Sequence, residues 1–274
     1  MMKKYICLLI GLLFCCHSYG QASDASVKPF SRLSWGVSLG TTGVGVDVAA
    51  PIASFVDIRA GFDFFPSFNL STSFATNALN AESFTHDIDM PENIDFNVRP
   101  YLSTGHLLFD FYPIKSADFK IVAGVYFGNS NVGEAISASA EEEMKSVYEY
   151  NQEKREEARK EHWTESQLQR ALIGVNMGDY LLEPNREGRI VASYRTNVVQ
   201  PYLGIGYGRS VKQDGKLGWN VELGARVWGK PTVLCNAVEV VDDTWDKSGS
   251  SLWRTVARAQ IYPTLTVRLT GKIF

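Results

Sequence analysis

The chain has 274 residues and carries 27 lysine and arginine residues against 30 aspartate and glutamate residues, a formal net charge of −3. This balance argues against a nucleic-acid partner, because proteins that bind the phosphate backbone concentrate positive charge. A mean hydropathy of −0.11 is too polar for a protein built from several membrane-spanning helices.

The first twenty residues have the pattern of a secretory signal peptide. Lys3 and Lys4 precede an apolar run over residues 5–16, and a small residue follows at Gly20. The alternative, an uncleaved membrane anchor, is disfavoured because a helix needs roughly 20 apolar residues to cross a bilayer. We therefore predict an exported protein that is cleaved after Gly20, with a mature domain over residues 21–274.

Cysteine use and hydropathy restrict the form of the mature chain. Three of the four cysteines fall in the predicted signal peptide, so only Cys235 remains and we expect no intrachain disulfide. No later segment resembles a membrane-spanning helix. Only helices and closed barrels satisfy all backbone hydrogen bonds inside hydrocarbon, so a membrane location would require a barrel.

Alternation of apolar and polar residues is the main structural signal in the rest of the chain. In residues 55–65, apolar side chains occupy the even positions from Val56 to Phe64, and charged or small ones occupy the odd positions from Asp57 to Asp63. Such alternation is typical of strands with one apolar and one polar face. It recurs at residues 103–112, 118–128, 199–207, 217–227 and 264–273, with shorter runs around residues 35–48.

Glycine indicates which face lies inside the barrel. Most strand glycines share the polar parity, with Gly105 and Gly271 as the main exceptions. A barrel of about eight strands is only wide enough inside for its own side chains, so glycines beside a few long charged residues suit a filled polar lumen. The alternative is a soluble periplasmic barrel with an apolar ligand cavity, whose water-facing exterior would not need such small residues.

The two faces define two sets of residues. The predicted lumen charge network consists of Asp57, Arg59, Asp63, Asp110, Lys120, Glu222, Arg226 and Arg268. The predicted lipid-facing residues are Val56, Ile58, Phe62, Leu107, Phe109, Ile121, Val125, Leu203, Val221, Leu223, Val267 and Leu269. We expect Ile121 and Val221 near the membrane midplane, and aromatic borders at Trp35, Phe64, Phe111, Phe119, Phe127, Tyr207 and Trp219.

The spacing of the segments predicts a topology. Short links at residues 51–54, 113–117 and 212–216 alternate with long ones at residues 66–101, 129–197 and 229–260. Outer-membrane barrels pair short periplasmic turns with long external loops. If residues 31–39 and 42–50 form a hairpin, there are about eight strands and both termini are periplasmic; one strand through residues 33–49 would give seven. The predicted fold class is a closed antiparallel transmembrane β-barrel of about eight strands.

The longest loop contains a helical insertion, over about residues 137–175. Glu141 begins an acidic run that complements a helix dipole, and Thr164 with Gln167 forms a capping box that starts a second helix after a break near Trp163. One interpretation is a solvated charged helix over the barrel mouth, which its charge pattern favours. The other is a surface element that contacts a partner.

These features resemble the small outer-membrane β-barrel family of Gram-negative bacteria, in particular the porin-like "outer membrane protein beta-barrel" group. The resemblance rests on the exported amino terminus, residues 37–46 (VSLGTTGVGV), residues 58–66 (IRAGFDFFP) and the closing residues 263–269 (PTLTVRL) with terminal Phe274. It implies an outer-membrane location, contact with membrane lipid and lipopolysaccharide, and recognition of the C-terminal strand by the barrel assembly machinery.

Catalytic residues do not emerge from the sequence. The mature chain has three histidines, His86, His106 and His162, and none lies in a nucleophile elbow or a metal-binding spacing. We predict neither an enzyme nor a cofactor or metal site. The expected function is a structural, adhesion or surface-interaction role with a plugged lumen; the alternatives are a narrow porin or channel for small solutes and a lipid-modifying hydrolase, which would need a histidine paired with a serine or an acid.

Overall fold

The computed structural model describes residues 28–76, 91–114, 117–177, 180–211, 217–240 and 260–274. The predicted signal peptide lies outside these residues, as does His86. Neither helix in the described part of the chain is long and apolar enough to cross a membrane.

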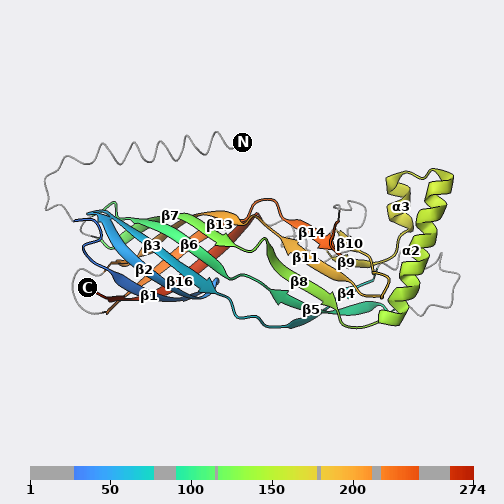
Figure 1. Ribbon diagram of the computed structural model, residues 1–274, viewed down its shortest axis with the longest axis horizontal. Helices are drawn as coiled ribbons and strands as arrows, with labels where there is room; N and C mark the ends of the chain where they lie inside the picture. The colour runs from blue at the N-terminus through green and yellow to red at the C-terminus, as the bar shows by residue number, and fades with distance from the viewer. Residues whose placement is uncertain (1–27, 77–90, 115–116, 178–179, 212–216, 241–259) are drawn as a thin grey trace.

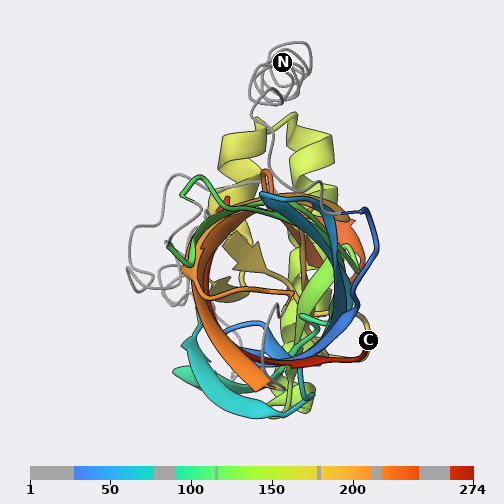
Figure 2. The ribbon, with the colours of Figure 1, turned by 90° about the vertical axis from the view of Figure 1, so that its left-hand side faces the viewer.

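Eight strands form a closed antiparallel barrel, which confirms the predicted barrel architecture and strand number (Figure 2). Around the wall the strands are β1 (Ser34–Gly40), β16 (Ile261–Lys272), β13 (Leu217–Val227), β12 (Val199–Tyr207), β7 (Phe119–Gly128), β6 (Thr104–Phe111), β3 (Val56–Phe64) and β2 (Gly43–Ala53). The first hairpin, β1–β2, turns at Thr41 and Thr42, and β1 closes the barrel by pairing Ser34 with Lys272. Each strand thus pairs with two neighbours, and the barrel has no free edge.

The sequence suggested that the long connections are simple loops, but they form regular structure instead. They contain a second, six-stranded sheet in the order β15–β14–β11–β8–β5–β4. Its strands are β4 (Leu70–Ala75), β5 (Asn93–Pro100), β8 (Asn131–Ser137), β11 (Val191–Arg195), β14 (Thr232–Cys235) and β15 (Val238–Glu239). We call the described residues within 65–103, 129–198 and 228–260 the extension.

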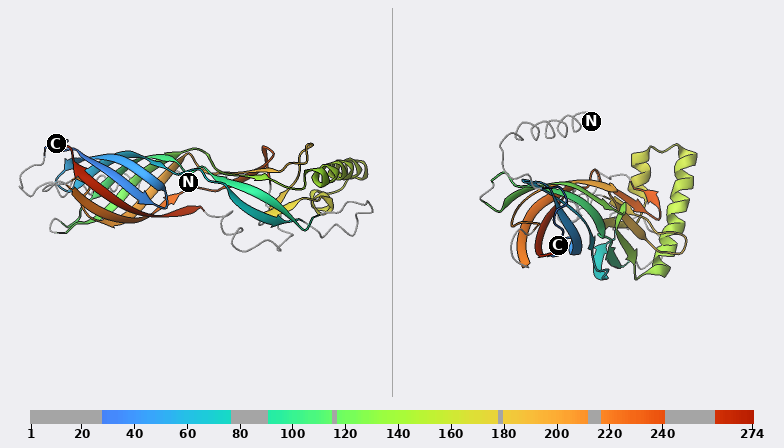
Figure 3. Two further views of the ribbon diagram at one scale, coloured as in Figure 1. Left: turned by 90° about the horizontal axis from the view of Figure 1, so that it is seen from below. Right: turned by 60° about the vertical axis from the view of Figure 1, so that its left-hand side comes forward.

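The extension prolongs the barrel along its axis (Figures 1 and 3). β4 follows β3, β5 precedes β6, β8 follows β7, β11 precedes β12 and β14 follows β13, each after a few residues. The same alternation that shapes the barrel shapes these strands: Ile94 and Phe96 are fully buried, whereas Asp95 between them is exposed. β1 and β2 do not continue into the extension, so at their turn the wall is shorter along the barrel axis than at the neighbouring strands.

The predicted helical insertion consists of α2 (Glu141–Glu161) and α3 (Glu165–Ala171). The capping box forms, with the side-chain oxygen of Gln167 accepting the backbone N–H of Thr164 at 2.8 Å. The helices lie at the far end of the extension (Figure 1), so α2 does not cover the barrel mouth as one interpretation expected. The six-stranded sheet lies between the helices and the barrel (Figure 1).

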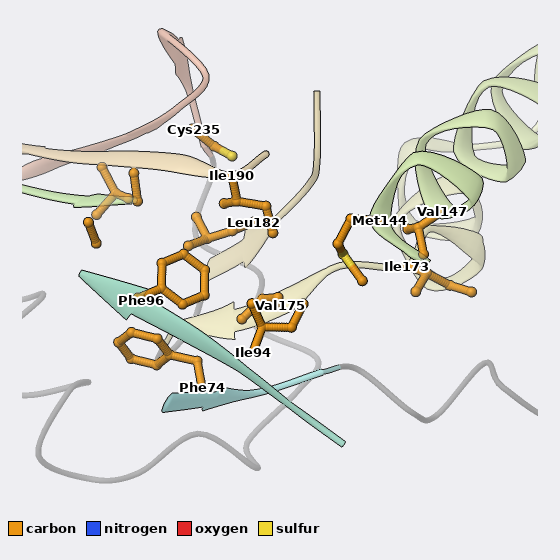
Figure 4. Packing of buried hydrophobic residues seen from close by; sticks show 13 residues of the cluster. Phe74, Ile94, Phe96, Met144, Val147, Ile173, Val175, Leu182, Ile190 and Cys235 are labelled. Carbon is orange, nitrogen blue, oxygen red and sulfur yellow. The ribbon is translucent and has the colours of Figure 1, made fainter. Parts of the chain in front are cut away.

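The extension has its own hydrophobic core (Figure 4). A short hairpin of β9 (Val175–Met177) and β10 (Tyr180–Leu182) packs with the sheet and with α2. The rings of Phe74 and Phe96 meet edge to face with centroids 5.2 Å apart. The core also contains Ile94, Ala135, Met144, Val147, Ile173, Val175, Leu182, Ile190, Ala192, Val233 and Cys235.

Helix α2 is fastened to the core by two polar side chains. Asn151 is buried and bonds both backbone groups of Ile173: its Nδ2 donates to the carbonyl at 2.7 Å, and its Oδ1 accepts the N–H at 2.9 Å. Arg155 donates from Nη2 to both carboxylate oxygens of Glu183 at 2.8 Å. Together with buried Met144 and Val147, these contacts make α2 a packed element.

Candidate functional site

The barrel interior holds the predicted charge network. All eight residues are at most 7 % exposed, and they come from strands on all sides of the barrel: Asp57, Arg59, Asp63, Asp110, Lys120, Glu222, Arg226 and Arg268. Two-residue periodicity directs them inward together with the other polar positions of the strands.

Four of these residues form a ring of alternating charges. Arg59 Nη2 lies 2.9 Å from Asp110 Oδ1 and 2.6 Å from Glu222 Oε2. Lys120 Nζ lies 3.2 Å from Asp110 Oδ2 and 3.3 Å from Glu222 Oε2. Buried charges are tolerated when they are paired in this way. Because β3 and β13 stand opposite each other in the wall, the Arg59–Glu222 pair spans the lumen.

The segment that follows β12 runs into the lumen at the short-turn end of the barrel, as Figure 2 shows. Ser210 is fully buried there, its N–H donates to Tyr112 Oη at 2.9 Å, and its hydroxyl donates to Asp110. Lys120 Nζ donates to Ser210 Oγ at 3.1 Å, and the next N–H, of Val211, donates to an Asp57 oxygen at 3.3 Å. Ser210 and Val211 thus connect the short-turn end of the barrel to the ring of charges.

A second ion pair and the glycines explain how the long side chains fit. Arg268 donates from Nε to Asp47 Oδ2 at 2.7 Å, and its Nη2 also bonds Asp47. A Cβ atom at Gly36 would lie 2.2 Å from Arg268 Nε, and one at Gly206 would lie 2.9 Å from Lys120 Cε. These inward glycines therefore supply the volume that the charged side chains occupy.

One of the two exceptional glycines also has a packing role. Gly271 is on the outward parity, and a Cβ there would lie 2.3 Å from the Trp35 indole. The indole thus covers the glycine on the outside of the wall. Gly105, the other exception, is not required by packing, since a Cβ there would meet its nearest atom, the backbone oxygen of Gly61, at an ordinary contact distance of 3.7 Å.

The outer face of the barrel is apolar. Of the twelve predicted lipid-facing residues none is buried; Phe62, Phe109, Ile121, Leu203, Leu223, Val267 and Leu269 are exposed, and Val56, Ile58, Leu107, Val125 and Val221 are half-buried. Ordinary water-soluble proteins do not expose a continuous apolar surface of this kind.

Aromatic side chains occur at both ends of this apolar face. At the short-turn end of their strands stand Trp35, Phe111, Phe119, Tyr207 and Trp219, and at the extension end stand Phe64 and Phe127. Val221 lies in the middle part of β13. Ile121 does not lie at the middle of its strand, because it is two residues from the short-turn end of β7.

Some interior residues were not predicted from the sequence as parts of the site. Ser210 carries no pattern that distinguishes it from other turn residues, and its role follows only from the fold. Tyr126 and Tyr202 occupy positions of the polar parity, so the alternation places them inside the barrel. Their rings meet edge to face with centroids 5.2 Å apart, and this contact follows only from the pairing register of β7 and β12. His106 is buried with its Nδ1 3.4 Å from Asp63 Oδ2, so its acidic neighbour is Asp63.

Catalytic groups are sparse in the described residues. No set of three or more His, Cys, Asp or Glu side chains there is arranged to hold a metal ion. Cys235 is in the core of the extension, where burial raises the pKa of its thiol to about 12 and its Sγ bonds the carbonyl of Glu183 at 3.2 Å. This thiol is therefore not poised to act as a nucleophile at neutral pH.

No protein-family model and no curated protein matches the chain. Solved structures that align with most of it include two from Acinetobacter baumannii. Acinetobacter baumannii CarO2 is 14 % identical with a TM-score of 0.44, over 91 % of this chain and 100 % of that chain. Acinetobacter baumannii CarO is 14 % identical with a TM-score of 0.42, over 90 % of this chain and 99 % of that chain. These scores describe a weak likeness, and the closed eight-stranded barrel is established by the strand pairing of this chain itself.

Proposed function

We propose that this chain is a Gram-negative outer-membrane protein in which a filled, non-conducting barrel carries a folded extension at the cell surface, for a structural, adhesion or surface-interaction role. The observation that carries the proposal is the polarity of the wall, with paired charges inside and apolar side chains outside. This arrangement suits a barrel surrounded by lipid, because closure satisfies the backbone and the charges face away from hydrocarbon.

The orientation follows from the lengths of the connections. Long connections face outward in outer-membrane barrels, so the extension would be extracellular and the short turns periplasmic. Membrane lipid and lipopolysaccharide would surround the apolar band. The barrel assembly machinery would bind the C-terminal strand β16, which ends beside exposed Ile273 and Phe274. The charged outer side of α2, within the predicted insertion 137–175, is the surface we assign to a partner.

A conductance measurement tests the filled lumen. We expect the purified protein, inserted into planar bilayers, to show no stepwise channel openings, because the Arg59–Glu222 pair spans the lumen and Ser210 lies within the lumen at one end. Protection of the barrel from protease in the same lipid verifies insertion. Reproducible openings would contradict the proposal and favour a narrow porin. In a separate assay, hydrolysis of added phospholipid would favour a lipid-modifying hydrolase.

A pair of arginine substitutions tests the membrane band. Val221→Arg, in the middle of β13, is expected to cost about 2–4 kcal/mol of folding free energy in bilayers, whereas Phe127→Arg, near the extension end of β7, is expected to cost about 0–1 kcal/mol. The reason is that a cation is costliest far from the interface. Urea titration of folding into lipid vesicles gives both values. Equal, negligible costs would mean that this face does not contact hydrocarbon.

A further inference from the structure

The extension-side half of the lumen contains a buried arginine without a carboxylate partner. Arg226 is 2 % exposed, and its guanidinium lies 4.3 Å from the ring centre of Tyr126 and 5.1 Å from that of Tyr262. Its Nη1 donates to Thr104 Oγ1 at 3.1 Å. Among the described residues, no atom accepts a hydrogen bond from its Nε or Nη2.

Two other buried arginines, Arg59 and Arg268, form ion pairs, and they show what the free Nε and Nη2 atoms of Arg226 are suited to bind. Arg59 donates from Nε and Nη2 to Asp110, at 3.1 and 2.9 Å. Arg268 uses the same two atoms on Asp47. Nε and Nη2 form one edge of the planar guanidinium, which matches the two oxygens of a carboxylate. In Arg226 the same edge is buried, and no described carboxylate accepts a hydrogen bond from it; the carboxylate of Asp63, which acts on Arg226 through its charge, lies beside His106 instead.

Neighbouring groups give the same layer further unused hydrogen-bonding capacity. Gln200 is buried, and its Oε1 accepts no hydrogen bond, although its Nε2 donates to the carbonyl of Asn197 at 3.1 Å. His106 Nε2 likewise lacks a hydrogen bond among the described residues, while its Nδ1 lies 3.4 Å from Asp63 Oδ2. An unpaired buried cation is strongly unfavourable, so a bound anion would stabilise Arg226.

We propose that the Nε–Nη2 edge of Arg226 binds the carboxylate, or a comparable small oxyanion, of a ligand that enters from the extension side. Tyr262 contacts both Arg226 and the shorter part of the wall, where its Oη donates to the carbonyl of Thr41 at 2.6 Å. Tyr262 is only half-buried, and β1 and β2 end beside it without a continuation in the extension. Tyr262 also stacks on the ring of Trp228, with ring centroids 4.8 Å apart, so a ligand would reach the guanidinium only when Tyr262 leaves this stack.

The test uses the full mature chain folded in detergent micelles, with acetate and inorganic phosphate as probes. Calorimetric titration should show saturable binding that is about tenfold or more weaker in Arg226→Lys, which keeps the charge but not the two-donor edge, and lost in Arg226→Gln. The control is Arg99→Gln, which alters an exposed arginine of the extension and should bind like the wild type. Whichever probe binds more tightly identifies the oxyanion class.

A second measurement on the wild-type protein covers the case in which the variants do not fold. The Nε–H resonance of Arg226 should shift in a saturable way during the same titration. Equal binding by Arg226→Gln, or a wild-type Nε–H resonance that does not respond to either probe, would overturn the proposal. Either result would leave the conductance and membrane-band tests unaffected, because they depend on other residues.

Discussion

Replacing Arg59 with methionine is expected to lower the free energy of unfolding of the barrel by about 3–5 kcal/mol. The substitution removes the cation that bonds both Asp110 and Glu222, and it leaves two buried carboxylates to share Lys120. An uncompensated buried charge costs much more than the loss of a surface pair. Urea-induced unfolding from lipid vesicles, followed by heat-modifiable gel mobility, measures the change.

A second variant separates the uncompensated charge from the loss of packing. In Arg59→Met/Glu222→Met, Asp110 and Lys120 still pair at 3.2 Å, so we expect this double variant to be more stable than Arg59→Met alone. The matched surface control is Arg195→Met, on an exposed residue of β11, with an expected change within about 0.5 kcal/mol. A loss below about 1 kcal/mol in Arg59→Met would show that the ring of charges is not a stabilising unit.

Replacing Phe96 with alanine is expected to destabilise the extension by about 3–5 kcal/mol while the barrel stays folded. Phe96 is fully buried, packs against Phe74, and belongs to a core made only of extension residues. The barrel is closed by its own strand pairing and filled by its own polar side chains, so it does not depend on this core. Limited proteolysis should cleave the variant within the extension much faster than the wild type.

The control for this experiment is Val238→Ala, at a side chain of the extension that is 69 % exposed, and it should leave the proteolysis rate unchanged. Heat-modifiable mobility of the protease-resistant core reports on the barrel. If Phe96→Ala abolished this mobility shift, the barrel and the extension would be one cooperative unit, contrary to the expectation.

Local residue patterns were sufficient to predict the barrel, its two faces and the helical insertion. Side chains alternate between the faces of a strand with a period of two, so Asp57, Arg59 and Glu222 could be placed inside before any strand pairing was known. The start of α3 is also a local feature, because Thr164 and Gln167 lie within one turn of each other. Such features depend on a few adjacent residues and need no knowledge of distant contacts.

Only the tertiary structure decided which charges meet and where the strands continue. Alternation cannot show that Arg59 reaches across the lumen to Glu222, or that Arg226 is left without a carboxylate, because both depend on the register of strands far apart in sequence. It also cannot distinguish a strand in the wall from one in the extension, such as β5, since Ile94 and Phe96 alternate in the same way in either place. The difference lies in what the apolar face meets: along the barrel it points outward, and in the extension it packs inward on a core that the chain builds for itself.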